Sequence, residues 1–146
     1  MAKFLQNKTY NFRIMKNLII DKTDNTPIVN FDVENDMFLI SGDSRPENVK
    51  LFFEPLLTWI EDYKVEIKPN RKQRTVNASF RLEYFNSSSA KYIVEIIKSI
   101  NQIELINLNM VVIINWFYNA GDEDMKESGE EISSLINIRM NLIQTK

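Results

Sequence analysis

Apolar and polar residues alternate along the chain between Thr75 and Tyr84. The apolar members of this alternation are Val76, Ala78, Phe80, Leu82 and Tyr84. A period of two predicts a β-strand with one buried face. The next apolar residues recur at helical spacing and share one side of a helix: Tyr92, Ile93, Ile96, Ile97 and Ile100. The intervening Asn86 to Ser89 is therefore predicted to be an elbow where a strand ends and a helix begins.

Shorter apolar segments predict three strands before this one, at residues 15–20, 28–32 and 37–40. The polar, turn-prone residues Glu34 to Asp36 predict that the second and third strands form a hairpin. Gly42 is one of only three glycines in the chain. We expect it to close this unit at a special backbone position.

A helix is predicted to begin at Ser44, because Ser44 and Glu47 have the spacing of a capping box. Pro46 then lies in the first turn, where a missing N–H costs nothing. The helix has an apolar stripe of Val49, Phe52, Phe53, Leu56, Ile60 and Tyr63. Pro55 lies within this stripe and is expected to kink the helix or break it in two.

Residues 65–74 are charged and predict a loop, whose basic residues favour a solvated surface over a nucleic-acid site. A docking surface for an acidic partner protein is the alternative there. The consecutive apolar residues Met110 to Ile114 indicate a central strand covered on both faces. A strand, a helix and a strand in sequence predict parallel neighbours, whose sites gather at the carboxyl ends of the strands. Ser87 and residues 116–121 lie at that edge.

These elements define an α+β or α/β fold, a small mixed β-sheet with helices in the order βββαβαβα. The apolar residues after position 131 are expected to pack the tail back on the core. The length of 146 residues corresponds to one domain. We therefore predict a single domain over residues 1–146, with residues 1–13 as a loose N-terminal extension.

Composition removes much of ordinary enzyme chemistry. The chain has no cysteine and no histidine, which excludes disulfides, thiolate catalysis, histidine-based triads and histidine or cysteine metal sites. We expect no cofactor. The net charge of −2 gives no general attraction to nucleic acid. The sequence shows no signal peptide and no apolar run long enough to span a bilayer, so we expect a cytoplasmic protein without membrane insertion.

The serines of the elbow have two interpretations. Asn and Ser accept hydrogen bonds from the unpaired N–H groups of a first helical turn, so they serve as helix caps. Alternatively, one hydroxyl is a phosphorylation site, because a helix N-terminus can hold an added phosphate. The run Ser87-Ser88-Ser89 exceeds what a single cap requires.

The acidic segment 122–131 also has two interpretations. Hard cations prefer carboxylate oxygens, so Asp122, Asp124 and Glu127 are candidate metal ligands of a hydrolytic enzyme. The spacing does not match a calcium loop, however, and acidic residues are favourable at a helix start through the helix dipole alone. We therefore predict no metal site.

Several motifs occur in one order between residues 17 and 142. They are Thr26-Pro27, Phe31-Asp32, Ser41-Gly42, Ser44-x-Pro46-Glu47-Asn48, Phe53-x-Pro55-Leu56-x-x-Trp59, Leu82 to Ser89 with Lys91, Asn115-Trp116-x-Tyr118 and Glu127-x-Gly129-Glu130. Together they resemble the SiaC family of bacterial regulatory phosphoproteins. The resemblance implies a fold like the anti-sigma-factor antagonist (STAS-like) domain and a switch without catalysis of its own.

The resemblance also implies partners and a phosphorylated residue. In the family, a partner kinase phosphorylates a hydroxyl in the elbow and a PP2C-type phosphatase removes the phosphate. The unmodified form binds and activates a diguanylate cyclase, which raises cyclic di-GMP and favours biofilm formation. The hydroxyl after the asparagine carries the phosphate, which is Ser87 here, with Ser88 and Ser89 as less favoured alternatives. Asn86 and Lys91 would support the elbow.

A partner-facing surface is predicted near this elbow, at Arg45, Glu47, Asn48, Tyr84, Trp116, Tyr118, Asp122 and Asp124. Two departures from the family pattern fall there. Arg45 replaces an aromatic residue, and Asn119-Ala120-Gly121 replaces a more acidic sequence. A third interpretation of the chain is a purely structural interaction domain whose serines only cap.

Overall fold

The computed structural model describes residues 15–146. The prediction of a loose extension at residues 1–13 lies outside the described residues. The strands and helices, in chain order, are β1 (Leu18–Ile20), β2 (Ile28–Asp32), β3 (Met37–Ser44), α2 (Val49–Ile67), β4 (Arg74–Phe85), α3 (Ser87–Asn101), α4 (Ile103–Ile106), β5 (Met110–Asn119), α5 (Glu123–Ile136) and β6 (Asn141–Thr145). The predicted order is confirmed, with the short helix α4 and the final strand β6 in addition.

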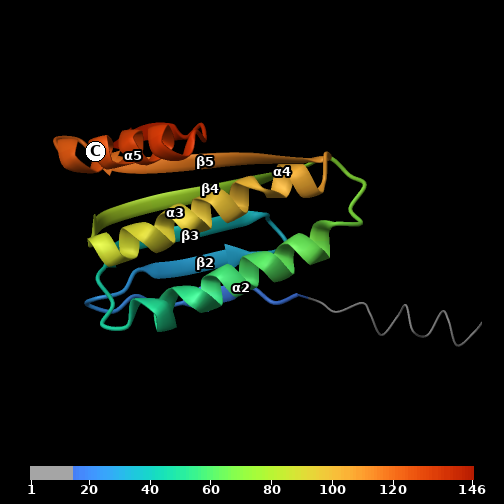
Figure 1. Ribbon diagram of the computed structural model, residues 1–146, viewed down its shortest axis with the longest axis horizontal. Coiled ribbons are helices and arrows are strands. Elements are labelled where there is room, and N and C mark those ends of the chain that lie inside the picture. The colour runs from blue at the N-terminus through green and yellow to red at the C-terminus, as the bar shows by residue number, and fades with distance from the viewer. Residues whose placement is uncertain (1–14) are drawn as a thin grey trace, which may run out of the picture.

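The strands form one six-stranded sheet in the order β1-β2-β3-β4-β5-β6. The β1–β2 and β2–β3 pairs are antiparallel, whereas the β3–β4, β4–β5 and β5–β6 pairs are parallel. Figure 1 shows α2 and α3 lying side by side in front of the sheet, with α5 beside β5. The sheet is therefore mixed, as predicted.

The helices cover one face of this sheet. Val76, Ala78 and Phe80 of β4 are buried on that face, together with the isoleucines of α3. α5 packs there too, because the indole Nε1–H of Trp116 donates to the carbonyl of Met125 at 2.9 Å. The strand and helix predicted from the alternation around the elbow are confirmed.

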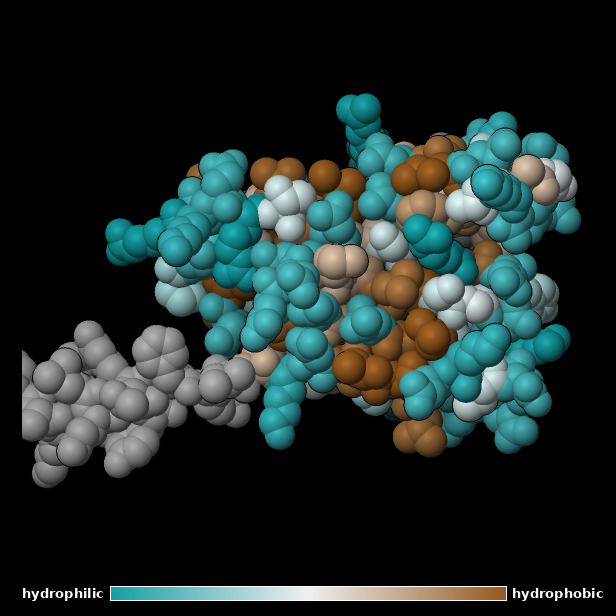
Figure 2. Space-filling view, turned by 180° about the vertical axis from the view of Figure 1, so that it is seen from behind, coloured by the Kyte–Doolittle hydropathy of each residue, from teal (hydrophilic) through white to brown (hydrophobic). Residues whose placement is uncertain are grey.

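The opposite face of the sheet has no helix over it among the described residues, and Figure 2 shows that side with mixed polar and apolar side chains. Val111 of β5 is 38% exposed. On the same face, the guanidinium of Arg81 lies 3.8 Å from the ring centroid of Phe117. The prediction that residues 110–114 are covered on both faces is therefore wrong. On the face without helices, the apolar side chains of residues 110–114 are only partly buried by the neighbouring strands.

A β-bulge alters the end of β4. Gly42 pairs with Leu82 but the next residue, Asp43, pairs with Tyr84, so Glu83 is an extra residue in β4. Gly42 has φ +115°, which glycine adopts without strain. The extra residue reverses the alternation, so Tyr84 is 47% exposed and was wrongly predicted on the buried face. Gly42 does mark a special position, but β3 continues to Ser44.

α2 begins later than the capping box predicts. Its N-cap is Asn48, whose side-chain oxygen accepts the N–H of Leu51 at 3.0 Å. Ser44 instead ends β3 and is fully buried, so Ser44 and Glu47 form no capping box and Pro46 precedes the helix. Pro55 lies inside α2, which continues unbroken to Ile67.

The far end of the sheet is fixed by a partly buried ion pair between Asp36 and Arg74. Asp36, in the β2–β3 turn, accepts hydrogen bonds from the Tyr63 hydroxyl at 2.7 Å and from Arg74 Nε at 2.9 Å. Burial, and then the bond to Asp36, raise the pKa of Tyr63 well above its usual range. This network joins the hairpin, α2 and β4, and so holds the scaffold on which the opposite edge is built.

The tail forms β6 as well as packing on the core. β6 pairs with the carboxyl half of β5, from Asn115 to Asn119. Met140 is buried as predicted, whereas Leu135 is 80% exposed. Within residues 15–146, no helix is both long enough and apolar enough to cross a membrane.

Candidate functional site

The parallel strands bring the candidate residues to one edge of the sheet. β3 ends at Ser44, β4 at Phe85 and β5 at Asn119, and these strands run in the same direction. The segments 45–48, 86–89 and 120–124 therefore all follow carboxyl ends of strands. The sequence prediction that Ser87 and the end of the strand at residues 116–121 lie at one edge is confirmed, and segment 45–48 joins them there.

Asn86 forms the elbow itself. Its side-chain oxygen accepts the N–H of Ser89 at 2.9 Å, and its carbonyl accepts the N–H of Ala90 at 2.9 Å. Its own N–H donates to the carbonyl of Ser44 at 3.1 Å. Asn86 is thus the N-cap of α3 and ties the helix start to the end of β3. This is the supporting role predicted for it.

Ser89 lies behind the elbow and is fully buried. The Ser44 hydroxyl donates to Ser89 Oγ at 2.8 Å, and the Ser89 hydroxyl donates to the Ser44 carbonyl at 3.1 Å. A kinase cannot reach this hydroxyl in the folded protein. Ser89, an alternative phosphorylation site on sequence grounds, is therefore a structural residue.

Ser87 and Ser88 are exposed in the first turn of α3. The first N–H groups of a helix have no partner within it. Asn86 satisfies those of Ser89 and Ala90, so the N–H groups of Ser87 and Ser88 remain for a ligand or solvent. Lys91 is exposed and lies one turn after Ser87, on the same side of the helix. The elbow thus presents accessible hydroxyls beside N–H donors and a cation.

The segment after β3 is also accessible. Arg45, Glu47 and Asn48 are exposed. The guanidinium of Arg45 lies 5.7 Å from the ring centroid of Tyr84, which is a cation–π contact. Because Ser44 pairs with Phe85, Arg45 follows directly beside the elbow. The structure therefore brings Arg45 into contact with Tyr84, beside the elbow that leads to Ser87.

Trp116 does not belong to that surface. It is fully buried, and its ring lies against Phe80 and Phe85 with centroids 6.0 and 5.9 Å away. The prediction that its side chain faces a partner is wrong, because Trp116 alternates onto the helix-covered face. Tyr118 is half-buried and lines a pocket of about 190 Å³ with Arg81 and Thr145.

The acidic segment caps α5. Asp122 is the N-cap, and its carboxylate accepts the N–H of Met125 at 3.1 Å. Glu123 and Asp124 lie in the first turn, where negative charge is favoured. Glu127 lies a turn further and is exposed. Within residues 15–146, no group of three or more acidic side chains is placed to hold a metal ion. The hydrogen bond from the N–H of Met125 to Asp122 is what supports the capping interpretation.

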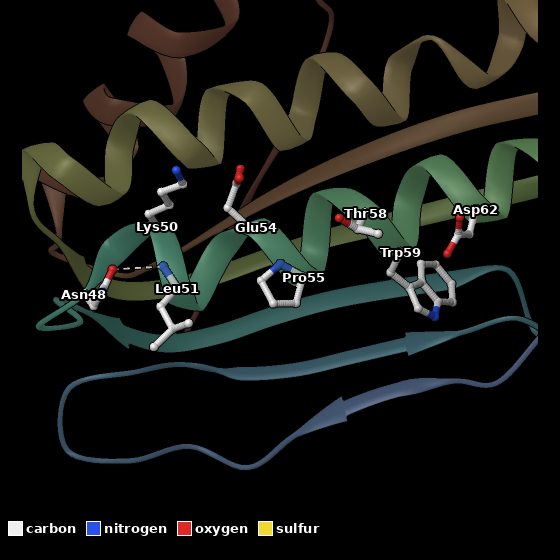
Figure 3. A pocket seen from close by; sticks show the side chains of 8 residues that line it. All are labelled: Asn48, Lys50, Leu51, Glu54, Pro55, Thr58, Trp59 and Asp62. Carbon is white, nitrogen blue, oxygen red and sulfur yellow. Dashed lines mark hydrogen bonds between the residues drawn. The ribbon is translucent and has the colours of Figure 1, made fainter.

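Sequence reasoning missed two features. The first is the role of the Ser44 hydroxyl. Its spacing from Glu47 predicted a helix cap, whereas the hydroxyl is buried and donates to Ser89. The second is a groove of about 590 Å³ along α2, lined by Asn48, Lys50, Leu51, Glu54, Pro55, Thr58, Trp59 and Asp62 and shown in Figure 3. A signal for it was present in the sequence, because Leu51, Pro55 and Trp59 recur every four residues on one side of the helix.

The fold and the site are those of a small α/β domain that presents hydroxyl groups at a helix start. The chain belongs to the SiaC family: the model described as SiaC family regulatory phosphoprotein matches residues 20–145. An uncharacterised protein of Pseudomonas aeruginosa (strain UCBPP-PA14) is 29% identical over 117 residues, which are 80% of this chain and 87% of that protein.

Solved structures agree with the family. The crystal structure of apo-SiaC from Pseudomonas aeruginosa is 24% identical and has a TM-score of 0.73; the match covers 90% of this chain and all of that chain. A chain of the complex between the diguanylate cyclase SiaD and its activator SiaC, from the same organism, is 25% identical with a TM-score of 0.74. That match covers 88% of this chain and 99% of the other. The mixed sheet and its helices are thus a SiaC fold.

Proposed function

We propose that this protein is a switch without catalysis of its own, whose unmodified form binds and activates a diguanylate cyclase. Phosphorylation of Ser87 by a partner kinase releases the cyclase, and a PP2C-type phosphatase restores binding. The observation that carries this proposal is the placement of Ser87. Its hydroxyl is exposed at the start of α3, while the nearby Ser89 is buried and already hydrogen-bonded.

The class of target follows from the family and from its solved complex. SiaC is described as the activator of the diguanylate cyclase SiaD, and this chain is similar to it over nearly its whole length. The exposed surface formed by Arg45, Glu47 and Tyr84 adjoins the elbow, and Asp124 lies at the same edge of the sheet. We assign the cyclase contact to this surface.

The phosphate would act locally. It adds about 1.5 to 2 negative charges and three acceptor oxygens at neutral pH. The N–H groups of Ser87 and Ser88, the helix dipole and the exposed Lys91 favour that charge in the free protein. A cyclase packed against the elbow would bury it, which is costly without a paired cation. The switch therefore needs no refolding of the domain.

The test compares serine variants of the full chain. Ser87→Ala should retain cyclase binding, and Ser87→Glu should weaken it at least tenfold, about 1.4 kcal/mol. Ser88→Glu is the matched control, because it places the same charge one residue along on an exposed position. Calorimetric titration with the cyclase and production of cyclic di-GMP are the readouts.

Equal affinities of Ser87→Ala and Ser87→Glu would sink the proposal and leave Ser87 as part of a helix start only. Loss of binding in Ser88→Glu alone would move the modified residue to Ser88. Phosphopeptide mapping of the protein from its own host identifies the modified serine independently, and it should report phosphate on Ser87.

A further inference from the structure

The groove along α2 consists of two rows of side chains. Leu51, Pro55 and Trp59 form an apolar row, and Lys50, Glu54, Thr58 and Asp62 form a polar row beside it. Members of each row are four residues apart and therefore lie one above another on the helix. Figure 3 shows Leu51, Pro55 and Trp59 projecting from one side of α2, with Lys50 and Glu54 projecting from the other.

The apolar row is only partly covered by the described residues. Leu51 is 72% exposed, and Pro55 is also exposed. The polar row has a net negative charge, because it contains two carboxylates and one lysine. Among the described residues, neither Glu54 nor Asp62 forms an ion pair. The groove therefore fits a segment that combines aromatic and basic side chains.

The chain supplies such a segment before the described residues. Residues 1–13 include the aromatic Phe4, Tyr10 and Phe12 and the basic Lys3, Lys8 and Arg13, and no acidic residue precedes Asp21. This segment precedes residues 20–145, the part matched by the SiaC family. Residues 1–13 thus lie outside the part of the chain that the family model matches.

Lys16, which follows this segment in the chain, lies at the wall of the groove. The indole Nε1–H of Trp59 donates to the carbonyl of Lys16 at 2.8 Å, so the described chain begins beside one end of the apolar row. Leu51 and Trp59 are separated by about 12 Å along the helix axis. Six residues, from Lys16 back to Tyr10, span up to about 20 Å when extended. Tyr10 and Phe12 can therefore reach Leu51 and Pro55.

We propose that the N-terminal segment of this chain binds in the α2 groove. In the proposed contact, Tyr10 and Phe12 would pack on the apolar row, and Lys8 and Arg13 would pair with the carboxylates of Glu54 and Asp62. Attachment at Lys16 gives the segment an effective concentration in the millimolar range at the groove, so the contact forms within one molecule.

Cysteine pairing tests this contact directly, because the chain contains no cysteine of its own. In the full-length Tyr10→Cys/Leu51→Cys variant, a disulfide within one molecule should form under mild oxidation. The matched control is Tyr10→Cys/Leu135→Cys. Leu135 is 80% exposed and lies on α5, at the β5 side of the sheet and away from α2 (Figure 1).

The first pair should close at least ten times faster than the control pair, at a rate independent of protein concentration. Adding Phe12→Ser to the first pair, or Glu54→Lys with Asp62→Lys, should slow closure several-fold. Equal rates for the two pairs, or no effect of Phe12→Ser, would overturn the proposal. So would disulfide-linked dimers whose formation rises with concentration, because a second copy would then occupy the groove.

Discussion

Replacing Ser89 and replacing Ser87 should have different effects on the free energy of unfolding. Ser89→Ala removes a hydroxyl that is 0% exposed and bonded to both the hydroxyl and the carbonyl of Ser44. The Ser44 hydroxyl would remain buried without its acceptor, which costs about 1–2 kcal/mol. Ser87→Ala removes an exposed hydroxyl, so the free energy of unfolding should change by less than about 0.5 kcal/mol.

Urea unfolding followed by circular dichroism measures both changes, provided that the slope with denaturant stays constant. In a thermal melt, the loss in Ser89→Ala corresponds to a midpoint lower by about 3–8 °C. The double variant Ser44→Ala/Ser89→Ala removes both partners and should cost less than the sum of the single variants. Equal destabilisation by Ser87→Ala and Ser89→Ala would refute the division into an accessible and a structural serine.

Two further predictions concern the packing around the site. A Cβ at Gly129 would clash with the indole ring of Trp116 and would lie 2.8 Å from Cδ2 of Leu142. Gly129→Ala should therefore lower the free energy of unfolding by about 1–3 kcal/mol in a denaturant titration. An unchanged unfolding midpoint would contradict this packing. The buried ammonium of Lys64 hydrogen-bonds the carboxylate of Glu61 at 2.8 Å and lowers the pKa of Glu61. This contribution to stability is present above the pKa of a free glutamate, about 4.3, and is lost as pH falls through the lowered pKa. Lys64→Met should therefore flatten the fall in stability between about pH 5 and 3, whereas an identical slope in both proteins would exclude the coupling.

The sequence predicted the elbow because its signals are local. Period-two alternation, the Asn-Ser run and the helical isoleucine pattern all lie within a short stretch, and the strand and helix on either side of Asn86 were correct. The parallel arrangement of β3, β4 and β5 also followed from the order of elements. The shared edge of the site was therefore predictable.

The errors arose from interactions between distant parts of the chain. Tyr84 was placed on the wrong face because a bulge opposite Gly42 inserts one residue into β4. Ser44 has the spacing of a cap, but the hydroxyl of Ser89, 45 positions later, takes its hydrogen bond. Trp116 lies next to exposed residues in the sequence and yet faces the core. A pattern within a short stretch of sequence does not show which distant residues will contact one another in the fold.

The central claim is that phosphate on Ser87 releases the cyclase. Its most direct test is the affinity of the diguanylate cyclase for protein that carries phosphoserine at position 87, produced by site-specific incorporation. Unmodified protein and protein with phosphoserine at position 88 are measured for comparison. The account predicts that phosphoserine at 87 weakens binding at least tenfold and lowers cyclic di-GMP production. Undiminished binding of the form phosphorylated at Ser87 would contradict it.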